Sequence, residues 1–474
     1  MMKERSVDVA VVGAGTTGLV ALSEIRRVTD SFVLIDPGPL GTTCARVGCM
    51  PSKALIHIAE DFHRRRVFEG EGIRGGEGLR VDGEAVMRRV RELRDGFAGG
   101  MVRKTERFGE RLIRAKARFV EEGVIEAGDV LVRAKAVVVG TGSHPFVPKE
   151  WEALGAGMLT SDTIFELEGL PKSMAVFGLG VIGCELGQAF ARLGVEVVGI
   201  SRSMRLGGAH DPEIVEAAAE ALGKEMTLWR GEAGSVERGD EGFRVRAGSH
   251  SREVEVVLVA MGRRPNVEGL GLERLGVRLD GRGVPEFDGK TLQVRGTRVF
   301  IGGDVHGEWP IMHEAWDDGR VAGYNAVRED PACFARRTRL AITFTAPQIA
   351  RAGLSWDDVA GGEVAVVSVG MESQGRAMMM GEAEGRFRIY ADRRNGRVLG
   401  AEFCAPRAEH LAHLLAWAIQ GGATVYDLLK MPFYHPTLEE AVRGGLQELA
   451  RDLPHGEGSL GMTFCHESAP DGMS

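Results

Sequence analysis

The feature that most constrains this chain is a glycine-rich turn that occurs twice, each time between a short apolar strand and a helical stretch. The first turn, residues 13–18 (GAGTTG), follows the apolar run Val7–Val12. The second, residues 178–183 (GLGVIG), follows Met174–Phe177. Strands that are apolar throughout are typical of a parallel sheet buried on both faces, and a glycine turn between such a strand and a helix is typical of a phosphate-binding βαβ unit. The sequence therefore predicts two dinucleotide-binding units.

The glycines of each turn have separate physical roles. The first permits the tight turn, the second lets the backbone approach a pyrophosphate, and the third lets the helix pack on the sheet. The N–H groups at the helix N-terminus are then available to the phosphates. The predicted nucleotide contacts are Gly13, Gly15 and Gly18 in the first unit and Gly178, Gly180, Ile182 and Gly183 in the second.

The residue at the end of the second strand of each unit distinguishes the nucleotides. Asp36 and Ser201 each lie 23 positions after the first glycine of their turn. A carboxylate there accepts hydrogen bonds from a ribose 2′-hydroxyl, whereas an arginine suits a 2′-phosphate. Asp36 therefore fits the adenosine ribose of FAD or NAD. Because Ser201 is followed by Arg202, with Arg205 close behind, the second unit is predicted to favour NADP.

The last third of the chain has a different character. The strand-like runs Phe387–Tyr390 and Val398–Phe403 flank Asn395-Gly396, a strong hairpin signal. Helical patterns follow at Glu409–Gln420 and Leu438–Leu449. We therefore expect an α/β protein with two Rossmann-like nucleotide-binding domains and a C-terminal α+β domain.

Two of the six cysteines lie close together in a setting suited to redox chemistry. Cys44 and Cys49 are five residues apart, and Pro51 marks the start of a helical run at Ala54–Glu60. Cys49 is thus expected at or near a helix N-terminus, where the dipole lowers the pKa of a thiol. Such a pair can cycle between dithiol and disulfide. Half of a metal site and two buried thiols are the alternative interpretations, although a metal site usually needs four ligands.

A histidine near the C-terminus is the candidate acid–base group. Pro436 is expected to start a helix, which would put His435 at its cap, and Glu440 lies little more than one turn farther on. A histidine held by a carboxylate is a standard acid–base arrangement, suited to protonating a thiolate. A capping histidine beside a surface glutamate is the alternative.

Composition and charge exclude several classes of function. The 59 Lys+Arg and 67 Asp+Glu residues give a formal net charge of −8, so there is no electrostatic basis for binding nucleic acid or an anionic membrane. Six cysteines are too few for a disulfide scaffold, and no run approaches the about 18 apolar residues of a membrane span. The chain begins with a strand pattern rather than a signal peptide. We expect a cytoplasmic protein without a metal site.

On these motifs the chain resembles the flavin-dependent pyridine nucleotide–disulfide oxidoreductases, and within them the dihydrolipoamide dehydrogenases. The resemblance extends over nearly the whole chain, and its most specific blocks are residues 44–53 (C-x4-C-x-P-S-K) and 435–440 (H-P-T-x-x-E). It implies FAD in the first unit, NADP or NAD in the second, and a homodimer whose C-terminal domain lends its His–Glu pair to the other subunit. Electrons would pass between a dithiol such as dihydrolipoamide, a Cys44–Cys49 disulfide, FAD and NAD(P).

The resemblance also implies domain limits. Residues 1–148 and 269–340 would form the FAD-binding and central domain, residues 149–268 the NAD(P)-binding domain, residues 341–454 the dimerisation domain, and residues 455–474 a mobile tail. The chain carries no lipoyl-type N-terminal module, so a lipoyl group would come from another protein, such as the lipoyl domain of a multienzyme complex.

Individual roles follow from the same resemblance. Cys44 would exchange with the substrate and Cys49 would face the flavin, beside a Lys53–Glu185 pair. His435 would be the acid–base group and Glu440 would orient it. The FAD contacts beyond the turn glycines would be Asp36, Thr43, Lys53, Ala117, Gly142, Ser143 and Asp304, and the further nicotinamide nucleotide contacts would be Ser201, Arg202 and Gly262.

The chain also departs from the family pattern. The family usually has Gly where Thr42 stands, Ala where Gly140 stands, and Pro-Ala in place of Thr16-Thr17. Dihydrolipoamide dehydrogenases, which use NAD, normally have an acidic residue at the Ser201-Arg202 position. The alternatives are therefore an NADPH-dependent reductase of another disulfide, similar to glutathione reductase, or of a metal ion, similar to mercuric reductase. The latter also needs a C-terminal cysteine pair, whereas the tail holds only Cys465. An alternative of another class is a non-catalytic flavoprotein redox sensor.

Overall fold

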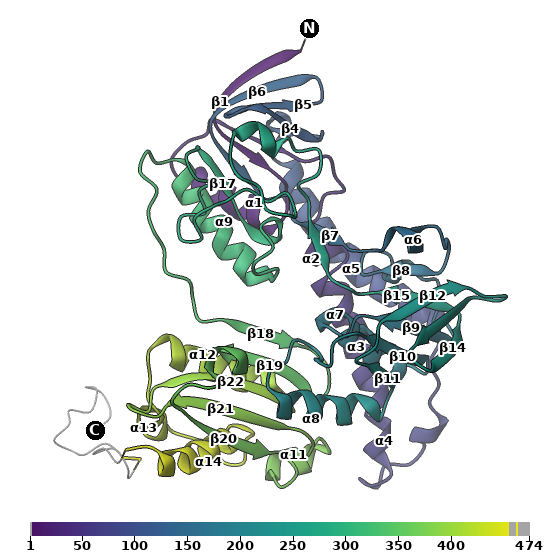
Figure 1. Ribbon diagram of the computed structural model, residues 1–474. Helices are drawn as coiled ribbons and strands as arrows, with labels where there is room; N and C mark the ends of the chain where they lie inside the picture. Colours follow the sequence, from purple (N-terminus) through teal and green to yellow (C-terminus); the bar gives the residue numbers. More distant parts are fainter. Residues whose placement is uncertain (1, 455–460, 463–474) are drawn as a thin grey trace.

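The molecule is built from three large β-sheets with their covering helices (Figure 1). Each sheet with its helices is called a region, and the regions are numbered in chain order. The structure, a computed structural model, describes residues 2–454 and 461–462. Most of the expected tail at 455–474, including Cys465, lies outside the described residues. Within the described ranges, no helix is both long and apolar enough to cross a bilayer.

The first sheet forms around the first glycine turn. β1 (Lys3–Val12) pairs in parallel with β2 (Phe32–Ile35) on one side and with β6 (Val130–Val139) on the other. β17 (Val299–Ile301), which comes from much later in the chain, also joins β6 in parallel. The remaining strands of this sheet are β3 (Leu112–Ile113), β4 (Ala117–Glu121) and β5 (Val124–Ala127).

Both faces of β1 are buried from Val9 to Val12, as the apolar residues there predict. Val9 and Val11 pack into a core with α1 (Thr16–Ile25) and α9 (Met312–Ala326), while Ala10 and Val12 pack into a separate core on the opposite face. α1 and α9 lie side by side on the sheet (Figure 1). This packing fixes α1, and hence the glycine turn that precedes it.

The second sheet repeats the arrangement around the second turn. Its five strands are all parallel, in the order β11-β10-β9-β15-β8. They are β8 (Met158–Thr160), β9 (Ser173–Phe177), β10 (Glu196–Ser201), β11 (Thr227–Arg230) and β15 (Val256–Val259). A three-stranded sheet of β12 (Gly234–Arg238), β13 (Phe243–Ala247) and β14 (His250–Val254) lies beside it, and β7 (Ser143–Pro145) pairs with β16 (Arg263–Pro265). The helices of this region are α6 (Lys149–Glu152), α7 (Val181–Arg192) and α8 (Pro212–Gly223).

The third sheet is antiparallel and confirms the expected C-terminal α+β region. Its strands are β18 (Leu340–Thr343), β19 (Gln348–Gly353), β20 (Val364–Gly370), β21 (Arg386–Asp392) and β22 (Val398–Ala405). Its helices are α10 (Trp356–Val359), α11 (Gly375–Met380), α12 (Ala408–Gln420), α13 (Val425–Leu429) and α14 (Glu439–Leu449). An extended segment joins α9 to β18 (Figure 1).

A single hydrophobic core joins the three regions at the place where the candidate site lies. α3 (Cys49–His63) contributes Leu55 and Ile56 to it, α7 contributes Phe190, and the third sheet contributes Ile349. The other helices of the first region are α2 (Thr43–Arg46), α4 (Arg65–Phe68) and the long α5 (Gly83–Glu106). α3 is therefore packed between α5 and α7. This packing fixes the side chains at the start of α3 relative to the second region.

One expected helix start is wrong. The prediction that Pro436 begins a helix placed His435 at the cap, but α14 begins at Glu439 with Leu438 as its N-cap. Thr437 explains the difference. Its N–H donates to Glu440 and its hydroxyl donates to the carbonyl of Tyr434, so the residues after His435 form a turn that precedes the helix.

Candidate active site

The first glycine turn is packed so tightly that two of its glycines have no room for a side chain. A Cβ on Gly13 would lie 2.3 Å from the carbonyl oxygen of Gly140, and Gly13 adopts a φ of +103°. A Cβ on Gly18 would lie 1.9 Å from the carbonyl oxygen of Gly13. Real Cβ contacts are never this short, so the turn and the helix after it require glycine at both positions.

The second turn repeats this geometry closely. A Cβ on Gly178 would lie 2.4 Å from the carbonyl oxygen of Ala260, and one on Gly183 would lie 1.9 Å from that of Gly178. Gly178 has a φ of +94°. The two units therefore share one local structure, although their other residues differ.

The middle glycines face open space instead, which is where a pyrophosphate would lie. A Cβ on Gly180 would meet no heavy atom of the described chain within 4 Å, and one on Gly15 would meet only the carbonyl oxygen of Gly140, at 3.8 Å. Gly15 and Gly180 are also the N-caps of α1 and α7. Because glycine has no side chain to cap a helix, the first N–H groups of both helices stay available to an anion. Both turns fit a dinucleotide.

The two strand ends differ. Asp36, just after β2, accepts hydrogen bonds from the backbone N–H groups of Ala14 and Gly38, each at 2.6 Å. Its carboxylate is therefore fixed beside the first turn, as a ribose ligand must be. At the end of β10, the Ser201 hydroxyl accepts from the N–H of Ser203 at 3.1 Å. Arg202 is exposed and makes no ion pair or hydrogen bond with any described residue.

Other expected nucleotide contacts are spread around the first unit. Ser143 donates to Asp304 at 2.9 Å, and Arg263 donates to the Ser143 hydroxyl at 2.8 Å. These bonds bring together the carboxyl ends of β6 and β17, next to the first turn, where the flavin's linking atoms are expected. Arg263 belongs to the turn-rich segment at Gly262–Asn266, and its bonds to Ser143 emerge only from the fold.

The remaining expected contacts are placed by the backbone. Thr43 is the exposed first residue of α2, and Ala117 begins β4, opposite Ala127. Gly142 and Gly262 both have positive φ, at +72° and +108°, and a Cβ on either would meet no described heavy atom within 4 Å. These two glycines thus leave open space at the carboxyl edges of the two parallel sheets.

The cysteine pair lies at the junction of two helices. Cys44 is in α2, and Cys49 is the first residue of α3, so the expectation of a helix N-terminus is confirmed. Both are free thiols in the structure. A hydrogen bond from Cys44, together with the nearby charge of Lys53, lowers the pKa of Cys49 to about 7. The same hydrogen bond and burial raise the pKa of Cys44. Cys49 is therefore the thiolate-forming member of the pair.

Lys53 and Glu185 form the expected ion pair beneath the cysteines. The Nζ of Lys53, one turn after Cys49, lies 2.8 and 2.7 Å from the two carboxylate oxygens of Glu185, which is 3% exposed. Phe344 of the third region completes the cluster. Its N–H donates to Glu185 at 2.9 Å, and its ring centroid lies 4.7 Å from the Lys53 ammonium. The sequence carried no signal for Phe344, because it belongs to no motif.

The expected His435–Glu440 pair is formed, but it lies far in space from the cysteine pair of the same chain. Nδ1 of His435 lies 3.0 Å from both carboxylate oxygens of Glu440, and this contact lowers the pKa of Glu440. The His435 side chain is 81% exposed. Figure 1 shows α14, which carries Glu440, far from α2 and its cysteine in the same chain. The pair is therefore exposed and far from the thiols of its own chain, and its expected acid–base role stays a prediction.

Thr42 adopts a conformation that explains why the family uses glycine at this position. Its φ is +57°, in the left-handed region that a β-branched residue rarely adopts. The residue still serves the site, because its hydroxyl accepts from the N–H of Ala45 at 3.2 Å and caps α2. The departure from the family pattern is therefore accommodated beside Cys44.

Comparison with known proteins agrees with this geometry. Residues 7–319 match the family described as pyridine nucleotide-disulphide oxidoreductase, and residues 340–444 match the dimerisation domain of that family. The dihydrolipoyl dehydrogenase of Thermus scotoductus is 31% identical, over 95% of this chain and 99% of that protein. Dihydrolipoyl dehydrogenase 2 of Haloarcula marismortui is 32% identical, over 92% of this chain and 95% of that protein.

Solved structures show the same fold. LpdA from Mycobacterium tuberculosis superposes with a TM-score of 0.81 at 25% identity, covering 94% of this chain and all of that one. The HOCl-induced flavoprotein disulfide reductase RclA from Escherichia coli, in a Cu(II) complex, reaches a TM-score of 0.82 at 20% identity, covering 94% of this chain and 99% of that one. The latter similarity is one of fold.

Proposed function

Because this chain belongs to the pyridine nucleotide-disulphide oxidoreductases, we propose that it is a dihydrolipoyl dehydrogenase-like enzyme in which Cys44 and Cys49 oxidise a dithiol. Members of the family bind FAD and NAD(P), and the match of residues 340–444 to the dimerisation domain supports a homodimer. The finer assignments, which are the substrate, the residue roles and the coenzyme preference, form the proposal.

One observation carries the proposal. Cys49 begins α3 with its pKa lowered to about 7, one turn from the Lys53–Glu185 pair. In thiol–disulfide exchange, the sulfur with the lower pKa is the better leaving group. Attack on a Cys44–Cys49 disulfide would therefore be directed to Cys44, and Cys49 would depart as a thiolate.

The dithiol substrate reduces the Cys44–Cys49 disulfide by two successive thiol–disulfide exchanges. One substrate thiolate attacks Sγ of Cys44, the Cys44–Cys49 bond breaks, and its electron pair leaves on Cys49. The second substrate thiolate then attacks the substrate sulfur of the mixed disulfide and releases Cys44, which takes up a proton. The substrate is oxidised to a disulfide and the enzyme is reduced to a dithiol. FAD, when bound, supplies the redox step that passes these two electrons to the nicotinamide.

His435 of the partner subunit accepts the proton of the substrate thiol in this scheme. Glu440 holds the ring through Nδ1, which leaves Nε2 to face the incoming thiol. The exposure of His435 in one chain supports this role, because a buried imidazole could not reach into a second subunit. Acid–base groups of this kind contribute about 10²–10⁴-fold to a rate.

Arg202 supports NADP as the preferred coenzyme. No carboxylate stands at the end of β10, and Arg202 is an exposed cation without a partner among the described residues. A free guanidinium can bind a 2′-phosphate through two parallel hydrogen bonds. An NADPH-dependent disulfide reductase is the second candidate function, and this same residue favours it.

A panel of substrates tests the proposal. The enzyme is assayed with dihydrolipoamide and with glutathione disulfide, each with both nicotinamide nucleotides. We expect turnover with dihydrolipoamide, and a higher kcat/KM for NADP⁺ than for NAD⁺. Faster reduction of glutathione disulfide than of lipoamide would favour the second candidate. If the enzyme turns over neither dihydrolipoamide nor any disulfide, that result would favour a redox sensor and overturn the proposal.

The two cysteine variants provide a matched spectroscopic control. In Cys44→Ser, the remaining thiolate would lie against the flavin, so we expect a long-wavelength charge-transfer band in the oxidised protein. In Cys49→Ser, which lacks the sulfur expected to face the flavin, we expect no such band at pH 7. The reverse pattern would exchange the two assigned roles.

A further inference from the structure

We propose that Asp357, in the third region, limits the selectivity for NADPH by holding Arg205 away from the 2′-phosphate of the coenzyme. This inference rests on the proposed use of NADPH by the second dinucleotide unit. It assigns a specificity-determining role to a residue far from both the glycine turn and the end of β10 in the sequence.

The loop after β10 keeps Arg205 close to the strand end. The N–H of Ser203 donates to the Ser201 hydroxyl, and the N–H of Arg205 donates to the Ser203 hydroxyl, at 3.1 and 3.0 Å. Arg230 of β11 donates to the carbonyl of Met204 at 3.1 Å. The backbone therefore turns twice within five residues, so Arg205 remains in the neighbourhood where a coenzyme 2′-phosphate is recognised.

The two arginines of this loop are in different electrostatic states. Nη2 of Arg205 donates to the Asp357 carboxylate at 2.7 Å, and Nδ1 of His210 lies 2.7 Å from the same oxygen. These contacts lower the pKa of Asp357, the one to His210 most strongly. Arg202, by contrast, has no described partner. The charge of Arg205 is thus compensated before any coenzyme arrives, whereas that of Arg202 is available.

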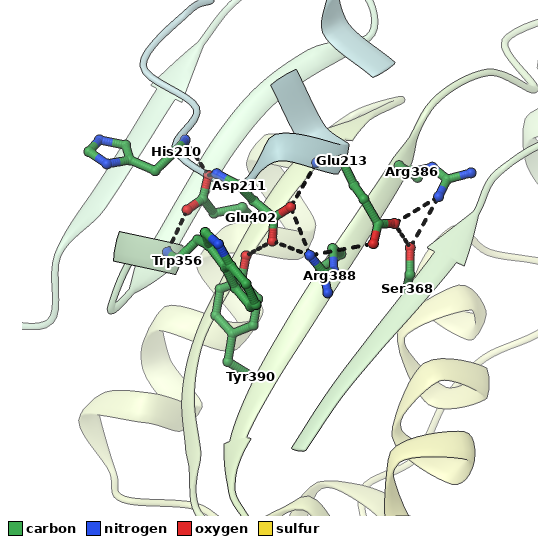
Figure 2. Close-up of polar contacts among 9 residues, drawn as sticks. All are labelled: His210, Asp211, Glu213, Trp356, Ser368, Arg386, Arg388, Tyr390 and Glu402. Atoms are coloured by element: carbon green, nitrogen blue, oxygen red, sulfur yellow. Dashed lines mark hydrogen bonds and ion pairs between the residues drawn. The ribbon is translucent and has the colours of Figure 1, made fainter. Parts of the chain in front are cut away.

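A buried carboxylate, that of Glu402, joins the end of the loop to Trp356, the residue before Asp357 (Figure 2). Glu402, on β22 and fully buried, accepts from the backbone N–H groups of His210 and Asp211 at 2.7 and 3.0 Å. Its other oxygen accepts from the N–H of Trp356 at 2.9 Å, and Trp356 directly precedes Asp357. The Glu402 side chain therefore ties the backbone at the end of the loop to the backbone just before Asp357.

The end of the loop is anchored just as firmly. Asp211, also fully buried, receives two hydrogen bonds from Arg388, at 2.9 and 2.8 Å, and one from the Tyr390 hydroxyl at 2.7 Å (Figure 2). Buried and fully paired carboxylates of this kind do not rearrange at low cost. The loop backbone is therefore fixed, and the side chain of Arg205 is the part that can move.

The ion pair itself is exposed enough to be exchanged. The side chains of Arg205 and Asp357 are 51% and 45% exposed. An exposed pair of this kind contributes little free energy, so a coenzyme phosphate competes with Asp357 for Arg205. The Asp357 carboxylate weakens binding of the coenzyme phosphate to Arg205 in two ways, because it is already bonded to the guanidinium and its charge repels the phosphate.

Removing the charge of Asp357 tests the inference. In Asp357→Asn we expect the ratio of kcat/KM for NADPH to that for NADH to rise about fivefold, the range that one exposed pair can supply. The binding of adenosine 2′,5′-bisphosphate, measured by titration calorimetry against 5′-AMP, should improve by the same factor. In the double variant D357N/R205A both gains should disappear.

A matched control and a second arginine variant separate the outcomes. Glu382→Gln removes one negative charge from another half-exposed ion pair of the same region, with Arg407, and should leave the ratio unchanged. Arg202→Ala should lower the ratio if the second unit uses NADPH as proposed. A falling ratio in R202A with no change in D357N overturns the role of Asp357 alone. If the ratio does not change in R202A, the proposed coenzyme is overturned. If the rise in the ratio persists in D357N/R205A, Arg205 is not the group that the loss of Asp357 releases, and the inference is overturned.

Discussion

The two dinucleotide units of this chain share a turn but not an environment. In both, the Cβ of the third glycine would lie 1.9 Å from the carbonyl oxygen of the first. The first unit ends at Asp36, whose carboxylate turns inward and binds its own backbone. The second ends at Ser201, and the loop after it is bound by the third region through Glu402 and Asp357. We therefore expect the turn to bind a dinucleotide in each unit and the residues after the strand to select which dinucleotide it is.

The difference also concerns which part of the fold holds each site together. α1 is covered by α9 within the core of the first sheet. The loop after β10 instead depends on side chains more than 150 residues farther along the chain. We therefore expect substitutions in the first unit to affect retention of a resident cofactor, and those in the second to affect a coenzyme that enters and leaves at each turnover.

The largest expected effect comes from adding a methyl group at equivalent glycines. Gly18→Ala should yield protein without flavin, because the helix cannot pack on β1. Gly183→Ala should keep its flavin but lose roughly 100-fold in its reduction by NADPH, since overpacking of a tight contact costs about 1–3 kcal/mol. The visible absorbance of the flavin per protein chain and stopped-flow reduction measure the two outcomes. Gly223→Ala, where a Cβ meets no described atom within 4 Å, is the neutral control. Loss of flavin from G183A would show that the two units are not independent.

A smaller effect is expected when the strand-end residues are exchanged. Asp36→Ser removes a carboxylate that binds two backbone N–H groups and is expected to bind the ribose. The affinity of the apoprotein for FAD should fall roughly 30- to 100-fold, as the loss of a charged hydrogen-bond acceptor predicts. Ser201→Asp should lower kcat/KM for NADPH about tenfold and leave NADH less affected. Fluorescence titration with FAD and steady-state kinetics measure these changes. Equal losses for NADPH and NADH in S201D would contradict the role of the strand end.

Much of this comparison was predictable from local sequence. The end of β9 at Phe177 and the position of Cys49 at the start of α3 followed from an apolar run and from Pro51, because local backbone preferences determine both. The requirement for glycine at the turns followed from their spacing. The helix expected at Pro436 failed because the turn there is fixed by side-chain hydrogen bonds of Thr437, which no propensity encodes.

Contacts between distant segments were not predictable from spacing. Lys53 and Glu185 are 132 residues apart, and only the family resemblance suggested that they pair. Phe344 and Asp357 belong to no motif, and each acquires its role because the third region folds back on the second. The NADP preference was inferred from Arg202, with Arg205 close behind it in the sequence. The fold distinguishes the two arginines, because Arg205 is already paired.

The two units touch at the Lys53–Glu185 pair, one helical turn after Cys49. The charge of Lys53 lowers the pKa of Cys49, and the charge of Glu185 opposes it. The thiolate fraction of Cys49 therefore grows as the pH rises through about 7. Cys44→Ser is the background for the test, because its hydroxyl keeps a donor beside Cys49 while only one sulfur of the pair remains to react.

In that background, Lys53→Met should move the midpoint of iodoacetamide alkylation upward by about one pH unit and slow the reaction roughly fivefold at pH 7, since one unit is the usual effect of a nearby opposite charge. Glu185→Gln should move the midpoint in the opposite direction. These opposite signs are the informative result, because a merely structural role for the pair would make both variants shift the midpoint alike. Two shifts of the same sign would mean that the second unit influences the cysteines through packing and not through the charge of α7.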